Sequence, residues 1–186
     1  MTPPVDATVT VRMDRHSIIA HIPRLRRYAR LLTGDTHRAD DLVQDTLERA
    51  CVKWQLWQPG AEPALQLRAW LFTVMHNVFV NQWRGKGAAA AREAMLIDDI
   101  ELEGPGRDPG LRLDLERALA QLPPDQIEII LLVALEDFSY AEAAILIGVP
   151  IGTVMSRLSR ARTRLAQLMD GAAPAKTGRP QLKVMK

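Results

Sequence analysis

The sequence predicts an all-α protein of two small helical domains joined by a flexible linker. Apolar residues recur at steps of three and four through almost every patterned segment, and no segment shows the strict alternation typical of a strand. Between about Lys86 and Gly110 this periodicity stops, and alanine, acidic residues, glycine and proline replace it. The chain has 186 residues with 47% hydrophobic content, enough for one ordinary domain or two small ones.

Residues 14–86 are predicted to form the first domain. Pro23 interrupts the first apolar stripe, so it either opens that helix at its first turn or kinks it. Thr33-Gly34-Asp35 is expected to end this helix and cap the next, and Pro59-Gly60 marks the next break. The three helices are expected over about 18–32, 36–54 and 65–84.

Residues 87–110 are predicted to be the linker, and residues 111–171 the second domain. As a flexible coil the linker would span about 25–30 Å. The tail, residues 172–186, contains four basic residues and no acid, and is predicted to be disordered. Helices in the second domain are expected over about 111–122, 125–135, 140–147 and 152–169.

Charge is distributed unevenly, although the net charge is only +2. From 150 to 169 there are four arginines and no acid, whereas from 98 to 103 there are four acids and no base. A basic helix of this kind indicates a surface for a polyanion.

The location of the protein is predicted to be cytoplasmic. The single cysteine, Cys51, cannot form an intramolecular disulfide, and its place in a helical stripe predicts a buried small apolar residue. The first residues lack the pattern of a signal peptide, and no apolar run approaches the roughly 18–20 residues that span a bilayer. No membrane insertion is expected.

The segment from Ser139 to Leu165 predicts a helix-turn-helix. Ala144 allows two helices to cross closely, and Gly148, four residues later, permits a tight turn. Gly152-Thr153 is expected to cap the second helix, and Val149-Pro150 to form the turn.

The second helix of this motif carries arginines on one face, at Arg157, Arg160 and Arg164, apart from its apolar stripe. The planar guanidinium can pair with a guanine edge in the major groove or bind a phosphate. The alternative is an ordinary solvated basic face. DNA contact is favoured because of the turn spacing and because this helix carries no acid.

Three segments carry a resemblance to a known family. Residues Ala118 to Leu168, which include LPPDQIEIILLVALEDFSYAEAAILIGVPIGTVMSRLSRARTRL, closely resemble region 4 of the extracytoplasmic-function (group 4) sigma factors. ARLLTGDTHRADDLVQDTLERA (Ala29 to Ala50) resembles the first conserved-region motif of that family. RAWLFTVMHNVFVNQWRGK (Arg68 to Lys86) resembles its promoter-melting helix. The segments stand in the order of the family, with a linker between.

The resemblance implies a sigma factor of the stress-response type. Such a factor binds core RNA polymerase, recognises the −35 and −10 promoter elements and captures melted −10 DNA. Region 4 would read the −35 element and also pack on the polymerase flap. Met155 stands where the family often has a basic residue, a departure that bears on sequence preference. The residues expected at the −35 element are Thr153, Ser156, Arg157, Arg160 and Arg164.

The resemblance also assigns two surfaces to the amino-terminal domain. An acidic helix face would meet the clamp helices of the large polymerase subunit, since complementary charge orients such a contact; the alternative is a solvated acidic face. The residues expected there are Asp40, Asp41, Leu42, Gln44, Asp45 and Glu48. At the −10 element, asparagines would read an unstacked base and cations would follow the displaced backbone. The residues expected there are His76, Asn77, Asn81, Arg84 and Lys86.

An enzyme is not predicted. The four histidines are scattered without metal-ligand spacing, and no phosphate-binding glycine loop is present to drive strand opening with ATP. No cofactor, metal or small-molecule substrate is expected. The predicted partners are core RNA polymerase, promoter DNA and an anti-sigma factor. Two alternatives stay open: a sigma-like decoy that sequesters an anti-sigma protein, and a helix-turn-helix repressor.

Overall fold

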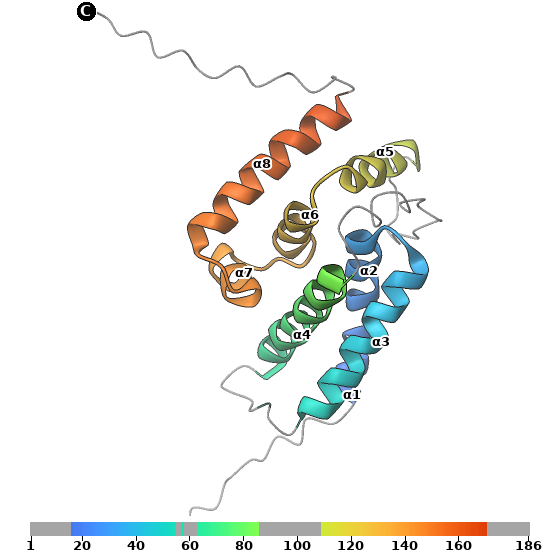
Figure 1. The fold of residues 1–186 in the computed structure, drawn as a ribbon, viewed down its shortest axis with the longest axis vertical. Helices are drawn as coiled ribbons and strands as arrows, with labels where there is room; N and C mark the ends of the chain where they lie inside the picture. Colours follow the sequence, from blue (N-terminus) through green and yellow to red (C-terminus); the bar gives the residue numbers. More distant parts are fainter. Residues whose placement is uncertain (1–15, 55–56, 58–62, 86–108, 171–186) are drawn as a thin grey trace, which may run out of the picture.

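The computed structural model describes residues 16–54, 57, 63–85 and 109–170 (Figure 1). Regular structure within these ranges is entirely helical, which confirms the predicted fold class. The predicted tail lies outside the described residues. So does the predicted linker, except for its last two residues, which begin a helix.

Four helices form the amino-terminal half: α1 (His16–Ile19), α2 (Ile22–Thr33), α3 (Thr36–Lys53) and α4 (Pro63–Gly85). Pro23 lies in the first turn of α2, so it opens that helix rather than kinking it. Gly34 ends α2 in the left-handed conformation (φ 67°), as predicted. The Asp35 carboxylate then caps α3 by accepting a hydrogen bond from the Arg38 backbone N–H at 2.7 Å.

The core of this half lies between α2, α3 and α4. Tyr28 and Phe72 meet there edge to face, with ring centroids 5.0 Å apart. Trp70 is only partly buried and lies beside Trp54 and Trp57. The prediction that Cys51 is buried is wrong, because its thiol is exposed. Ala50 takes the inward position, and the next residue on a helix is rotated by about 100°.

The carboxy-terminal half contains α5 (Pro109–Ala120), α6 (Pro124–Ile130), η2 (Leu131–Leu135), α7 (Tyr140–Ile147) and α8 (Ile151–Met169). The single helix expected over 125–135 is instead α6 followed by the π-helical turn η2. The Glu136 N–H bonds to the Leu131 carbonyl at 3.0 Å, five residues back. Just beyond this wide turn, the Phe138 ring meets Phe72 of the amino-terminal half edge to face, with centroids 5.5 Å apart.

The two halves pack against each other. Helix α4 contacts α7, and α2 contacts both α6 and η2 (Figure 1). The buried apolar side chains of both halves form one continuous cluster. The periodicity of the sequence predicted the separate helices but contained no sign of this packing.

Candidate nucleic-acid interface

Helices α7 and α8 form the predicted helix-turn-helix. Ser139 caps α7 through a reciprocal pair of bonds: its Oγ accepts from the Glu142 N–H at 3.2 Å, and its own N–H donates to Glu142 Oε2 at 2.8 Å. The hydrogen bonds from the Ser139 hydroxyl and backbone lower the pKa of Glu142. Gly148 ends α7 with φ 68°, as predicted, and the axes of α7 and α8 are bent by 106°. That angle is typical of the motif.

The predicted cap of α8 is wrong. Helix α8 begins at Ile151, directly after Pro150, and no side chain caps it. The Thr153 N–H bonds to the Pro150 carbonyl at 2.8 Å, so Thr153 already belongs to the first turn. Its side chain is partly buried.

The outer face of α8 carries two of the residues predicted for the −35 element in exposed positions. Ser156 and Arg160 are exposed, and Arg164 is partly so. The Arg160 Nε donates to the Ser156 backbone carbonyl at 3.3 Å, a contact within the helix. Met155 is 48% exposed next to them. The inner face is apolar and buried, with Val154, Leu158 and Ala161.

Arg157 differs from the other arginines of α8. Its Nε lies 3.2 Å from Asp125 Oδ2 of α6, and its side chain is only 28% exposed. The sequence showed correctly that α8 carries no acid, but the partner comes from another helix. Asp125 follows Pro123-Pro124 at the start of α6, and no local spacing links it to Arg157. A DNA contact by Arg157 would require this ion pair to break.

The residues predicted for the −10 element do not share one face of α4. Asn77 and Asn81 are exposed, and the Asn77 side chain donates to the Thr73 carbonyl at 2.8 Å. His76 points instead to the carboxy-terminal half, where its Nδ1 lies 2.7 Å from Glu128 Oε1. One step along a helix turns a side chain by about 100°, which separates His76 from Asn77. The Arg84 side chain and Lys86 lie outside the described part of the chain.

Four of the six residues predicted for the acidic face of α3 are exposed: Asp40, Asp41, Gln44 and Glu48. Asp40 forms an ion pair with Arg26 of α2 at 3.2 Å, and Gln44 donates to Glu48 at 3.0 Å. Asp45 is partly buried, because it accepts a hydrogen bond from Gln82 of α4 at 2.7 Å. The Leu42 side chain is fully buried, so it lies in the core and not on this surface.

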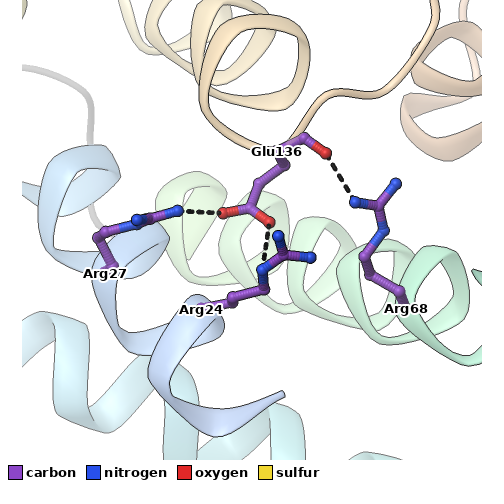
Figure 2. Close-up of polar contacts among 4 residues, drawn as sticks. All are labelled: Arg24, Arg27, Arg68 and Glu136. Carbon is purple, nitrogen blue, oxygen red and sulfur yellow. Dashed lines mark hydrogen bonds and ion pairs between the residues drawn. The ribbon is translucent and has the colours of Figure 1, made fainter. Parts of the chain in front are cut away.

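A polar cluster that the sequence analysis missed joins the two halves (Figure 2). Glu136, just after η2, is fully buried and faces Arg24 and Arg27 of α2, at 4.0 Å and 3.4 Å. The Arg68 Nη1 of α4 donates to the Glu136 backbone carbonyl at 2.8 Å. Burial raises the pKa of Glu136 more than the nearby arginines lower it. The cluster joins residues up to 112 positions apart (136 minus 24), beyond the reach of any local pattern.

Among the described residues, no group of three or more His, Cys, Asp or Glu side chains is placed to hold a metal ion. No single helix in the described ranges is long and apolar enough to cross a membrane; the one pair with the length and composition, α7 with α8, is sharply bent.

Two family models match the chain. The sigma2 domain of PhyR matches residues 18–76, which span α2, α3 and most of α4. Region 4 of sigma-70 matches residues 112–165, which include the helix-turn-helix.

The similarity to individual relatives extends over most of the chain. The sigma factor EcfG of Rhodopseudomonas palustris (strain TIE-1) is 40% identical over 165 residues, covering 85% of this chain and 87% of the relative. SigF of Caulobacter vibrioides is 33% identical over 152 residues, covering 80% and 81%. The sigma factor RpoE of Bartonella quintana, solved with the anti-sigma factor NepR, has a TM-score of 0.66 and 36% identity, covering 83% of this chain and 95% of that one.

These similarities decide between the functions that the sequence left open. The two relatives that are 40% and 33% identical over most of the chain are named as sigma factors, and both family models describe sigma domains. The chain therefore belongs to the extracytoplasmic-function family of RNA polymerase sigma factors, non-enzymatic proteins that direct transcription initiation with RNA polymerase.

Proposed function

We propose that α8 binds the −35 element of a promoter through Ser156 and Arg160. The observation that supports this most is the division of α8 into a buried apolar face and an exposed polar face, presented by a 106° bend after α7. A helix presented in this way can enter the major groove, where an arginine pairs with guanine. Thr153, Arg157 and Arg164 lie nearer the protein and would bind phosphates or support the helix.

The exposed asparagines of α4 are proposed to hold the opened −10 strand. An amide side chain presents one donor and one acceptor, which suits the hydrogen-bonding edge of an unstacked base. Asn77 and Asn81 are four residues apart and therefore neighbours on one side of α4. Capture of the base would offset the few kcal/mol that unstacking costs. Arg84, near the end of α4, and Lys86 would contact the backbone of the opened strand.

The acidic face of α3 is proposed to meet the clamp helices of the large polymerase subunit. Asp40, Asp41, Gln44 and Glu48 present it to solvent. Asp45 fixes α3 to α4 through Gln82, and Leu42 supports the face from beneath. The carboxy-terminal half would contact the polymerase flap.

An anti-sigma factor is proposed as a further partner. Two proteins of similar structure were solved with such a partner. RpoE was solved with the anti-sigma factor NepR, and CnrH was solved with the cytosolic domain of CnrY. Because it acts with RNA polymerase, this chain is proposed to work in the cytoplasm.

The experiment that tests the whole proposal is transcription in vitro with core polymerase. Start-site selection that depends on this chain is expected on its own promoters. Binding to an operator without polymerase, and no initiation, would instead support a repressor.

A second experiment tests the −10 assignment. Asn77→Ala should reduce initiation on a closed duplex at least about tenfold and should be rescued on a template already mismatched at the −10 site. Gln121→Ala, an exposed amide on the other half, is the matched control and should leave both templates unaffected. Failure of the mismatched template to rescue Asn77→Ala would reject base capture.

A further inference from the structure

Two large apolar side chains lie exposed at the start of α8. Ile151 is 45% exposed and Met155 is 48% exposed. They are four residues apart, so they are neighbours on one side of the helix. Single exposed apolar residues are common on protein surfaces, whereas an adjacent pair exposes a continuous apolar patch. The core does not require this pair, because other residues form the buried face of α8: Val154, Leu158 and Ala161.

The apolar pair adjoins the polar residues that are proposed to bind DNA. At about 100° per residue, Met155 lies on one side of Ser156 around the helix, and Arg160 lies on the other side. Ser156 and Arg160 are both exposed. The exposed face of α8 therefore has an apolar flank, Ile151 with Met155, and a polar flank, Ser156 with Arg160. Both flanks lie within the first ten residues of α8, the part of such a helix that contacts base edges.

Gly152 leaves the surface between the two flanks open to a close approach. It is exposed, and a Cβ added to it would meet no atom within 4 Å. Its φ does not lie in the left-handed region, unlike that of Gly148. Neither the backbone angle nor packing within the described ranges therefore requires a glycine here, although glycine is a poor helix former. A missing side chain allows a partner to approach the backbone closely.

We propose that Ile151 and Met155 contact the C5-methyl groups of thymine in the −35 element, so that recognition requires an A·T pair near the base pair that Arg160 contacts. This proposal rests on the proposed function of α8. Neither side chain has a hydrogen-bond donor or a strong acceptor, so a purely polar base edge would lose water against them without compensation. Thymine is the one DNA base that presents a methyl group in the major groove. The unbranched Met155 side chain can adjust to the position of that methyl group.

The spacing along α8 predicts where the thymine lies. Met155 and Arg160 are five residues apart, which is about 7.5 Å along the helix axis. Successive base pairs are about 3.4 Å apart. The thymine is therefore expected within about three base pairs of the guanine that Arg160 contacts.

The first test selects promoter fragments that are randomised at the −35 element, with the chain bound to core polymerase. The selected fragments should share a thymine, on either strand, within about three base pairs of a required guanine. An enriched element without such a thymine would overturn the proposal. If no sequence is enriched, the proposed function of α8 fails and this inference fails with it.

Replacement of each selected thymine by uracil then removes the methyl group and keeps the base pair. At one position or more this should weaken binding of the unaltered chain about three- to fivefold, as expected for one methyl group left in water. The double variant Ile151→Ala with Met155→Ala should bind the two duplexes almost equally, because the shorter side chains do not reach the methyl group. Leu113→Ala is the matched control: this leucine of α5 is 40% exposed, and its loss should leave the preference for thymine unchanged.

Met155→Lys gives a second measurement at the same position. It should abolish the preference for thymine and make the salt dependence of binding steeper by about one phosphate contact. Fluorescence anisotropy of the polymerase-bound chain measures both quantities, and a preference that persists in Met155→Lys and in the double variant would overturn the proposal. Weaker binding of the double variant to core polymerase, with the preference for thymine retained, would assign the apolar pair to the polymerase instead. Enrichment of a −35 element with no response to uracil would overturn this inference alone and leave the proposed function of α8 standing.

Discussion

Helices α3 and α8 are both divided into a buried apolar stripe and an exposed charged stripe, but they use their charges differently. Two acids of α3 are joined to neighbouring helices: Asp40 is paired with Arg26, and Asp45 accepts a hydrogen bond from Gln82. On α8, the one hydrogen bond that Arg160 makes within the described ranges is to the backbone of its own helix. The α3 face is therefore held in place by its own half, whereas Arg160 is available to a partner.

The difference shows that a charged stripe in a sequence contains residues with separate tasks. Leu42 occurs within the acidic segment and belongs to the core. Arg157 occurs within the arginine stripe and holds α8 to α6 through Asp125. Periodicity identifies the face, and the contacts of the folded chain decide which residues of that face can bind a partner.

The largest effect is expected from Leu42→Ala. Loss of a fully buried leucine should lower the free energy of unfolding by about 2–5 kcal/mol. Val52→Ala, on the same helix but with an 82% exposed side chain, is the control and should change it by less than about 0.5 kcal/mol. Denaturant titration measures both. If both substitutions changed the free energy of unfolding by the same small amount, Leu42 would not be a core residue.

Arg160→Ala tests the α8 side of the comparison. Loss of one base contact should weaken binding to a −35 duplex by about 1–3 kcal/mol, roughly 5- to 150-fold, with folding unaffected. Fluorescence anisotropy of the factor bound to core polymerase measures this loss. An equal loss of polymerase binding would count against the assignment.

Arg157→Ala sharpens the contrast within α8. It should weaken DNA binding less than Arg160→Ala does. Arg157→Ala and Asp125→Ala should each lower the free energy of unfolding by about 0.2–1 kcal/mol, because each removes the same ion pair. The double variant should lose no more than either single one, because both remove the same ion pair. Additive losses would show that Arg157 and Asp125 act separately.

Charge reversal on α3 should have a moderate effect. Asp41→Lys with Glu48→Lys is expected to weaken polymerase binding about tenfold at low salt, and less at high salt. Asp114→Lys, an exposed acid on α5, makes the same kind of charge change away from this face and should have little effect. Competition for core polymerase measures the difference; similar losses in both would indicate a general charge effect.

The smallest effect is expected from Glu136→Gln, and it depends on pH. Burial raises the pKa of Glu136 above its usual 4.5, so the folded chain binds this proton more readily than the unfolded chain. Ionised Glu136 therefore lowers stability above its folded pKa, and this penalty is relieved as pH falls through that pKa. Glu136→Gln should be at least as stable as the unaltered chain at neutral pH, with the difference shrinking on acidification. Thermal melting of the Glu136→Gln variant and the unaltered chain across a pH series measures this difference in stability. The opposite trend would mean that the attraction of the arginines outweighs the burial of the carboxylate.

Features that depend on neighbours within a few residues were predictable from the sequence. Pro23, Gly34, Asp35 and Gly148 all act as expected, because each sets a backbone angle or satisfies a nearby N–H. The family and its helix-turn-helix followed from ordered local motifs.

Features that depend on distant partners were not predictable. Arg157 meets an acid on another helix, and His76 turns away from Asn77 to meet Glu128. The Arg27–Glu136 contact joins residues 109 positions apart. A single sequence reports which face of a helix is apolar, but not which helix will lie across from its polar positions.

The π-helical turn η2 determines how the residues that follow it are rotated about the helix axis. An ordinary α-turn in its place would rotate the next residues by about 100° per residue gained or lost. Phe138 would then lose its contact with Phe72 of α4, and α7 and α8 would change their orientation relative to the amino-terminal half. A one-residue deletion within 131–135 would thus leave the composition of the core nearly unchanged and still alter the direction in which the helix-turn-helix of α7 and α8 presents its exposed face.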